Sequence, residues 1–313
     1  MIFTRRFKYG CFGLLLFAWP LLSFSDFPTR PLTLIIGFNP GGSVDRQAQI
    51  ISRLLEERLT QSIEIVYHAG AGGATSAAML AFSREQGYVL QYGPSHTFVF
   101  TPLASITSYE PQSFRYIAAL TRDQLALVTA SDKNIDSWEA LLAYWREQGE
   151  LRYATQILLD RYIMRSIAEQ EGLALQIIPT SGGRHMSELL LNGNVDLAFS
   201  GGTHQRFADQ MTVLASFGSE RLIDYPDRPS VEELGYPYSL NSFGVFAVPA
   251  DTPDTQIEVL SQALAEIIED PRFIRFIEQE IQVPIAFLNE AQLTGYLERQ
   301  AELFCQLVED QRP

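Results

Sequence analysis

The sequence predicts an α/β protein with two lobes, each built on strands that alternate with helices. Short apolar segments alternate along the chain with segments of helical spacing, glycine-rich loops separate them, and the pattern restarts near residue 150. Apolar segments without polar alternation are typical of strands buried on both faces of a parallel sheet. Without its first 25 residues the chain has about 288 residues, a length at which a single core usually divides into two.

The N-terminus has the features of an export signal. Three basic residues precede an apolar stretch at 11–22, and the small residues Ser23 and Ser25 follow it. The stretch is shorter than the ~20 apolar residues that span a membrane, and Pro20 interrupts it. We therefore expect cleavage before Asp26 and an exported chain, with a membrane anchor as the alternative.

Charge limits the partners that the protein can have. The chain carries 23 basic and 37 acidic side chains, a formal net charge of −14, and loss of the three basic residues of the signal lowers it to −17. Such a surface disfavours nucleic acid and anionic lipid. A small anion remains compatible, because local amide dipoles can outweigh a distant and screened field.

The cysteines and histidines give no sign of a metal or a disulfide. Cys305 is the one cysteine that remains after processing, so we expect no intrachain disulfide. The four histidines are scattered without the spacing of a metal site. We expect neither a cofactor nor a metal.

Strands and helices alternate from residue 32 onward. Residues 32–37 predict a buried strand, and 44–59 predict a helix with Ile50, Leu54 and Leu55 on its apolar face. The expected elements that follow are strands at 63–67, 89–93, 116–120 and 125–130 and helices at 74–82 and from 136. After the restart they are strands at 151–154, 175–178, 195–200 and 243–248, helices at 161–170 and 186–191, and a helix-rich segment from 252.

Two glycine-rich loops, at 38–45 and 68–75, each lie between an expected strand and an expected helix. A helix start has unpaired amides and a partial positive charge, so glycines there let an anion approach the backbone. A third polar loop, at 94–97, follows the next strand, and loops after parallel strands gather at one sheet edge. Neither glycine loop has the Lys-Ser/Thr ending of a nucleotide P-loop. The loops predict a site for a small carboxylate, or else are tight turns that need glycine for backbone reasons.

Five motifs, taken in order, resemble one family. They are Pro-Gly-Gly-Ser-Val-Asp at 40–45, Gly-Ala-Gly-Gly at 70–73, Gly-Tyr-Val-Leu at 87–90, Pro-Ser-Val-Glu-Glu-Leu-Gly at 229–235 and Val-Pro-Ala-Asp-Thr-Pro at 248–253. Their order and spacing resemble the substrate-binding receptors of tripartite tricarboxylate transporters, also called Bordetella uptake gene receptors. The motifs run through essentially the whole mature chain.

The resemblance implies a two-lobed periplasmic binding protein fold of the type II-like, Venus-flytrap kind, with two hinge crossings. We place the crossings near Leu127 and Phe243. This division gives a signal peptide at 1–25, a first lobe at 26–127 plus 243–313, and a second lobe at 128–242. The implied protein is periplasmic and not an enzyme, and it delivers a small organic acid from an interlobe cleft to membrane transporter subunits. We expect it to be a monomer.

The resemblance also implies which residues hold the ligand. Family receptors hold a carboxylate through amides, hydroxyl groups and water of the first-lobe loops, which here carry Gly42, Ser43 and Thr97. The second lobe departs from the family pattern, because Thr155 and Gln156 stand in a usually Ser/Gly-rich loop. The candidate ligand-binding residues are Asn39, Gly42, Ser43, Ala71, Gly72, Gly73, Ser95, His96, Thr97, Thr155, Gln156, Ser181, Gly182, Arg184, Gly201 and Thr203.

Several readings of single residues remain open. Arg184 could pair with a ligand carboxylate or be solvated, and His96 and His204 could contact a ligand, although we favour the surface for both. Ile157 and Leu158 could form an apolar wall for a ligand or pack within a helix.

The function has two alternatives. One is a receptor that presents its closed form to a membrane sensor kinase. The other is an exported hydrolase, which we disfavour because the sequence has no Gly-x-Ser-x-Gly nucleophile elbow.

Overall fold

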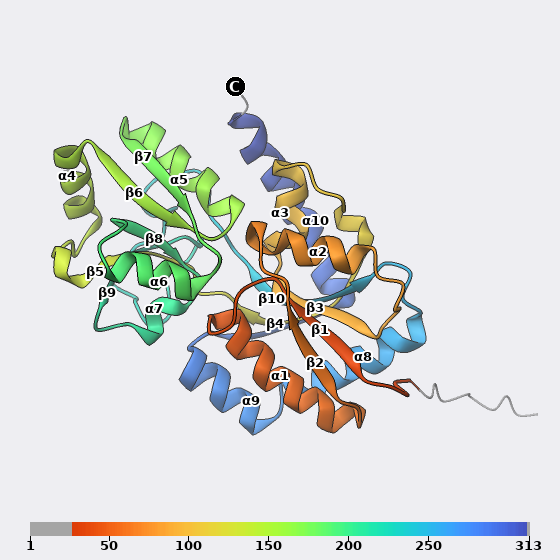
Figure 1. The fold of residues 1–313 in the computed structure, drawn as a ribbon. Coiled ribbons are helices and arrows are strands. Elements are labelled where there is room, and N and C mark those ends of the chain that lie inside the picture. The colour runs from red at the N-terminus through yellow and green to blue at the C-terminus, as the bar shows by residue number, and fades with distance from the viewer. Residues whose placement is uncertain (1–26, 312–313) are drawn as a thin grey trace, which may run out of the picture.

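The computed structural model describes residues 27–311, where two separate sheets, each flanked by helices, form two lobes (Figure 1). One sheet has six strands and the other has five. The expected two-lobed α/β fold is confirmed. Between residues 27 and 311, no helix combines the length and the apolar character that crossing a membrane requires. The expected export signal lies outside the described residues.

The first lobe contains both ends of the described chain. Its early elements are β1 (Leu32–Ile36), α1 (Ser43–Leu59), β2 (Ile63–Tyr67), the 3₁₀ turn η1 (Ala71–Gly73), α2 (Ala74–Ala81), β3 (Val89–Pro94), α3 (His96–Ala104), η2 (Pro111–Ser113) and β4 (Phe114–Arg122). Its late elements are β10 (Phe243–Pro249), α8 (Asp254–Ile267), α9 (Pro271–Arg275), the π-helical turn η4 (Phe276–Ile281), β11 (Ile285–Asn289) and α10 (Glu290–Asp310). The strand order is β11-β4-β10-β3-β1-β2. β1 pairs in parallel with β2 and β3, whereas β10 returns antiparallel between β3 and β4.

The second lobe is one continuous segment. Its elements are β5 (Ala126–Ala130), η3 (Ser131–Lys133), α4 (Trp138–Gln148), β6 (Glu150–Thr155), α5 (Leu158–Glu171), β7 (Ala174–Pro179), α6 (Gly183–Leu191), β8 (Leu197–Ser200), α7 (Thr203–Arg206) and β9 (Met211–Ser216). The strand order is β7-β6-β8-β5-β9, with β6 parallel to β7 and β8 and with β5 antiparallel to both of its neighbours. In both lobes, loops after parallel strands therefore reach a common sheet edge.

The chain passes between the two sheets twice. Residues 123–125 connect β4 to β5, and residues 217–242 connect β9 to β10. The two connections are joined to each other, because Asp123 N donates to Ser242 O at 2.9 Å. Leu127 lies within β5 and Phe243 opens β10. The lobe boundaries that we placed at Leu127 and Phe243 stay a prediction.

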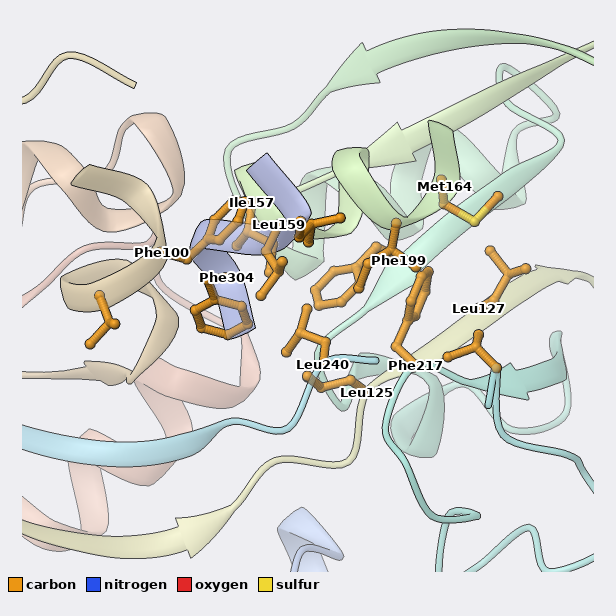
Figure 2. Packing of buried hydrophobic residues seen from close by; sticks show 14 of the residues in the cluster. Phe100, Leu125, Leu127, Ile157, Leu159, Met164, Phe199, Phe217, Leu240 and Phe304 are labelled. Atoms are coloured by element: carbon orange, nitrogen blue, oxygen red, sulfur yellow. The ribbon is translucent and has the colours of Figure 1, made fainter. Parts of the chain in front are cut away.

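A hydrophobic cluster continues from one lobe into the other (Figure 2). Phe100 of α3 meets Phe304 of α10 and Tyr162 of α5, with ring centroids 5.2 and 5.4 Å apart. Ile157 and Leu159, at the start of α5, are buried in the same cluster. Each side chain of this size contributes about 1.5–3 kcal/mol when fully buried, so the cluster stabilises the lobes in contact with each other.

Three elements differ from the sequence-based expectation. The prediction of a loop at 94–97 is wrong, because β3 ends at Pro94 and α3 begins at His96. We did not expect β9, and β11 interrupts a segment that we expected to be helix-rich. Both strands pair with distant segments, β9 with β5 and β11 with β4.

Candidate functional site

A cavity of about 40 Å³ lies between the two lobes, where loops at the strand ends of both sheets meet. One water needs roughly 10–15 Å³ of such space. The cavity therefore admits a few waters, and a larger ligand requires the lobes to separate. Its lining residues are Phe38, Gly42, Ser43, Val44, Pro94, His96, Asp123, Leu125, Gln156, Ile157, Gly183, Phe199, Gly201 and Thr203.

A larger cavity of about 630 Å³ lies elsewhere, between α3 and α10. Its lining includes Val99 and Leu103 of α3 and Leu297 and Ala301 of α10. All of it belongs to the first lobe, so movement of one lobe against the other does not enclose a molecule there. We therefore take the smaller interlobe cavity as the candidate site.

Two helices from opposite lobes begin at the interlobe cavity. α1 starts at Ser43 and α6 at Gly183, and both residues line it. A Cβ on Gly42 would lie 3.9 Å from Gly183 N, so the two helix starts nearly touch. The N-cap residues Gly42 and Gly182 have no side chain with which to cap the first amides. Two positive helix ends thus face one space, an arrangement that favours an anion.

The glycine loop after β2 approaches the second lobe closely. Gly72 has a φ of +64°, and a Cβ there would lie 3.2 Å from Ile157 Cα. The turn after β2 also contacts the start of α3, because Thr97 Oγ1 donates to Gly72 O at 2.9 Å. Gly73, with a φ of +92°, would also bring a Cβ within 3.0 Å of the Thr97 side chain. Ala71 begins the same 3₁₀ turn.

The rim of the cleft is bridged by two candidate residues. Asn39 Nδ2 donates to Ser181 Oγ at 3.0 Å, and Gly182 lies beside them with its Cβ position 3.7 Å from Asn39 N. Arg184 takes the solvated arrangement: its side chain is 74% exposed and pairs with Glu188 at 3.1 Å.

Thr155 and Gln156 differ in position although they are neighbours. Gln156 lines the cavity, and its side chain is fixed by donation from Nε2 to Phe199 O at 2.9 Å. Thr155 is fully buried, and its hydroxyl contacts the Asp160 carboxyl group and Ile157 O. Burial raises the pKa of Asp160 to about 7, although hydrogen bonds from Thr155 and Gln156 act in the opposite direction. Thr155 thus positions the loop without lining the cavity.

The two histidines that we favoured for the surface are buried, which corrects that expectation. His96 is 4% exposed and His204 is fully buried, because each lies in the first turn of a helix that closely follows a buried strand, α3 after β3 and α7 after β8. Burial lowers the pKa of both to about 3, so both are neutral at ordinary pH. His204 Nδ1 contacts Ser200 Oγ at 2.9 Å and lies outside the cavity lining. Only His96 lines the cavity.

His96 belongs to a small polar cluster at the second crossing. Its Nδ1 lies 3.2 Å from Ser242 Oγ, while its buried Nε2 has no hydrogen-bond partner among residues 27–311. Ser95 Oγ lies 3.4 Å from Ser242 Oγ and accepts from Phe243 N at 3.3 Å. Ser95 therefore supports the crossing and does not line the cavity.

Asp123, which we did not single out in the sequence, also lines the cavity. Its Oδ2 is buried and has no hydrogen-bond partner in the described part of the chain. Burial raises the pKa of Asp123 to about 6, partly offset by a hydrogen bond from Ser242. The adjacent Arg122 pairs with Glu220 at 2.8 Å instead. The available signal was a carboxylate in the short segment between the strands expected at 116–120 and 125–130, near the crossing that we placed at Leu127.

The structure thus divides the candidate residues into two groups. Those that line the cavity are Gly42, Ser43, His96, Gln156, Gly201 and Thr203. Those that surround or support it are Asn39, Ala71, Gly72, Gly73, Ser95, Thr97, Thr155, Ser181, Gly182 and Arg184. Among residues 27–311, no three His, Cys, Asp or Glu side chains are grouped to hold a metal ion. Which residues contact a ligand stays a prediction.

Comparison with known proteins shows which family this sequence resembles over most of its length. Residues 45–310 match the family described as "Tripartite tricarboxylate transporter family receptor". Protein BugT of Bordetella pertussis is 27% identical over 275 residues, which cover 84% of each chain. The periplasmic binding protein BugD shares the fold with a TM-score of 0.82 at 21% identity, over 91% of this chain and 98% of that one.

A third relative is MatC from Rhodopseudomonas palustris, whose structure contains bound malate. It has a TM-score of 0.79 at 21% identity, over 90% of this chain and 100% of its own. At this identity the likeness to both solved structures concerns the fold. The family match, in contrast, extends over most of the sequence, from the first glycine loop to the end of α10. The chain therefore belongs to the tripartite tricarboxylate transporter receptor family.

Proposed function

We propose that this protein is a periplasmic receptor that binds a small organic acid between its lobes and delivers it to a tripartite tricarboxylate-type membrane transporter. One observation carries the proposal: α1 and α6 come from opposite lobes and begin on either side of one cavity, at Ser43 and Gly183. A carboxylate placed there accepts hydrogen bonds from both lobes at once. Family membership and the malate bound to MatC support the same class of ligand.

Ligand-driven closure follows from this arrangement. A ligand that contacts both lobes binds the closed form more tightly than the open form, and so shifts the population toward closure. The cavity lining contains no arginine or lysine, so in this proposal backbone amides and hydroxyl groups such as that of Ser43 hold the carboxylate. The proposed cycle is capture and release, with no bond made or broken.

The location and partners complete the proposal. A signal peptide at 1–25 directs the chain to the periplasm, where it acts as a monomer. The closed form is the species that docks on the transporter, because only that form carries the ligand between its lobes.

A thermal-shift screen of residues 26–313 tests the binding step. The panel contains mono-, di- and tricarboxylates and amino acids, each beside a neutral amide analogue such as succinamide for succinate. A ligand that binds only the folded protein adds about 2.7 kcal/mol at a hundredfold excess over its Kd. We expect at least one acid to raise Tm while its amide does not. A flat response, after mass spectrometry has excluded a copurified ligand, contradicts the proposal.

Delivery is a separate step with its own measurement. Cells that carry the transporter should take up the labelled acid, and loss of the receptor should abolish high-affinity uptake. Equal uptake without the receptor contradicts delivery and leaves binding intact.

A further inference from the structure

The larger cavity, between α3 and α10, is a groove that runs along one face of α10. Its lining on that helix extends from Glu290 to Ala301, a length of about 16 Å, or three turns, at 1.5 Å per residue. Val99 and Leu103, four residues apart on one face of α3, form the other wall. No side chain of residues 27–311 fills the space of about 630 Å³ between these walls. We call this space the α3–α10 groove.

The floor of the α3–α10 groove is apolar and its rim is polar. Val99, Phe114 and Leu297 line it and are buried, whereas Glu110 and Glu298 line it and are exposed. Two helices with an apolar channel between them form the surface on which a third helix packs its apolar face. In the part of the chain that the structure describes, no third helix lies there.

The charges of the groove are predominantly negative. Its lining contains Glu110, Glu290 and Glu298 but only one cationic residue, Arg115. Arg115 is already engaged, because it donates to both carboxylate oxygens of Glu290 at 2.8 and 3.0 Å and to Asp254 at 2.6 Å. Glu110 and Glu298 take part in no ion pair among residues 27–311. Two unpaired carboxylates therefore flank the apolar floor.

Length, apolarity and charge together select the occupant. A helix of three turns or more, apolar on one face and carrying lysine or arginine beside that face, complements the groove in all three respects. Basic amphipathic helices of this kind lie at membrane surfaces, which is where a transporter meets its receptor. The lipid itself fits poorly, since the chain without residues 1–25 has a net charge of −17 and anionic lipid repels it.

We propose that the α3–α10 groove docks a basic amphipathic helix of the membrane transporter, with the apolar face of that helix on Leu103 and Leu297 and its cationic side chains at Glu110 and Glu298. The docking step rests on the proposed receptor function and names the contact that delivery uses. The groove is compatible with the closed form, because Phe100, which contacts Tyr162 of the second lobe, lies outside its lining.

A model helix tests the chemistry of the groove directly. The probe is a fluorescently labelled peptide of ~18 residues, or five turns, with leucine on one face and lysine on the other. One comparison peptide has glutamate in place of lysine, and a second has the leucine–lysine composition in scrambled order, without an apolar face. By fluorescence anisotropy, we expect the amphipathic leucine–lysine peptide to bind at least about tenfold more tightly than either comparison peptide.

Two variants locate that binding on the groove. Glu298→Lys reverses a rim charge and should weaken binding of the leucine–lysine peptide at least about fivefold. Ala301→Trp places a large side chain in the space that the peptide would occupy, and it should abolish detectable binding. Glu298 is exposed, so its variant decides the question if Ala301→Trp does not fold.

Glu258→Lys is the matched control for charge. Glu258 is an exposed glutamate of α8, in the same lobe but on the opposite face of the six-stranded sheet. The control changes the net charge by the same amount as Glu298→Lys, so it measures how far an acidic protein attracts any cationic peptide. We expect it to bind the leucine–lysine peptide as wild type does.

The same variants connect the groove to delivery. For an acid that raises Tm in the thermal-shift screen, Glu298→Lys and Ala301→Trp should leave the Kd measured by calorimetry unchanged and lower its uptake into cells that carry the transporter at least about tenfold. Glu258→Lys should support full uptake. Loss of acid binding in the two groove variants would place their effect on the interlobe site and overturn the docking role.

The remaining outcomes also separate docking from the receptor function. Equal binding of the lysine and glutamate peptides overturns the charge match, and equal losses in Glu298→Lys and Glu258→Lys overturn the location. Binding to vesicles of phosphatidylethanolamine and phosphatidylglycerol without transporter, lost in both groove variants, assigns the groove to lipid and overturns the transporter as its partner. A flat thermal-shift screen contradicts the receptor function, whereas full uptake by the groove variants overturns only the docking site.

Discussion

The side-chain amide of Asn39 donates a hydrogen bond to Ser181 Oγ at 3.0 Å, across the cleft from the loop after β1 to the loop after β7. The two residues belong to different lobes, so this bond exists only while the lobes are together. Its free energy therefore contributes to closure and not to the stability of either lobe alone. A neutral hydrogen bond of this kind contributes about 0.5–1.5 kcal/mol.

Removing either end of this bond should weaken ligand binding through closure. We expect Asn39→Ala and Ser181→Ala each to raise the ligand Kd by about two- to tenfold, the equivalent of one hydrogen bond. The double variant should be no weaker than the weaker single variant, because both changes remove the same interaction. Calorimetry on the four proteins measures the coupling. Additive losses would show that the two side chains act independently.

A side chain at Gly72 should prevent closure. A Cβ there would lie 3.2 Å from Ile157 Cα and 3.4 Å from Gln156 O, so Gly72→Val pushes the lobes apart. We expect loss of measurable binding and of the ligand-induced decrease in the radius of gyration by X-ray scattering. Gly193→Val is the matched control, because Gly193 has a similar φ of +69° but nothing within 4 Å of its Cβ position. Equal binding losses in both variants would assign the effect to backbone strain.

Arg184 should have little effect on affinity. Its side chain is 74% exposed, pairs with Glu188 and lies outside the cavity lining. Surface ion pairs contribute about 0–1 kcal/mol, so we expect Arg184→Ala to change the ligand Kd by less than about twofold. Glu188→Ala, which frees the arginine from its partner, serves as the comparison. A tenfold loss in Arg184→Ala alone would place the guanidinium on the ligand.

Asp196 should determine part of the acid sensitivity of the second lobe. Burial raises its pKa, but hydrogen bonds from Arg152 and Lys133 outweigh this effect and lower the pKa from 3.8 to about 2. The folded protein therefore binds this proton less tightly than the unfolded chain does. The ionised carboxylate therefore stabilises the fold by about 2 kcal/mol. This stabilisation is complete at pH values above the pKa of Asp196 in the unfolded chain, and it is lost as pH falls from about 4 to about 2.

The measurement is urea unfolding across that acid range. Asp196→Asn should be less stable than wild type near neutral pH and should lose less stability on acidification. Asp227→Asn, which replaces an exposed carboxyl, should follow the wild-type curve. Parallel acid curves for Asp196→Asn and wild type would argue against this role.

Sequence patterns predicted strands best where burial is continuous on both faces. β1 and β5 are buried almost throughout, and their expected ranges, 32–37 and 125–130, agree closely with the observed ones. β11 was missed because its residues are only partly buried and it depends on antiparallel pairing with β4, some 165 residues earlier in the chain. α3 was missed because its first turn contains His96 and Thr97 and its last contains Pro102, which together resemble a loop.

The sequence predicted only the part of the candidate site that consists of backbone amides at a helix start. Of the two glycine loops that predicted an anion site, the loop before α1 places Gly42 and Ser43 in the cavity lining, whereas Ala71, Gly72 and Gly73 before α2 lie outside it. The start of α6 at the cavity was not part of that prediction. Asp123 and His96 carry no such local pattern. Their importance depends on the two crossings, which place Ser242 beside both side chains although it lies over 100 residues away in sequence. Only the tertiary structure shows that contact.

The hydrogen bond from Asp123 N to Ser242 O couples the two connections between the lobes. The bond fixes the two connections to each other at one point. A rotation of the lobes about this point preserves the bond, whereas a sliding of one connection past the other breaks it.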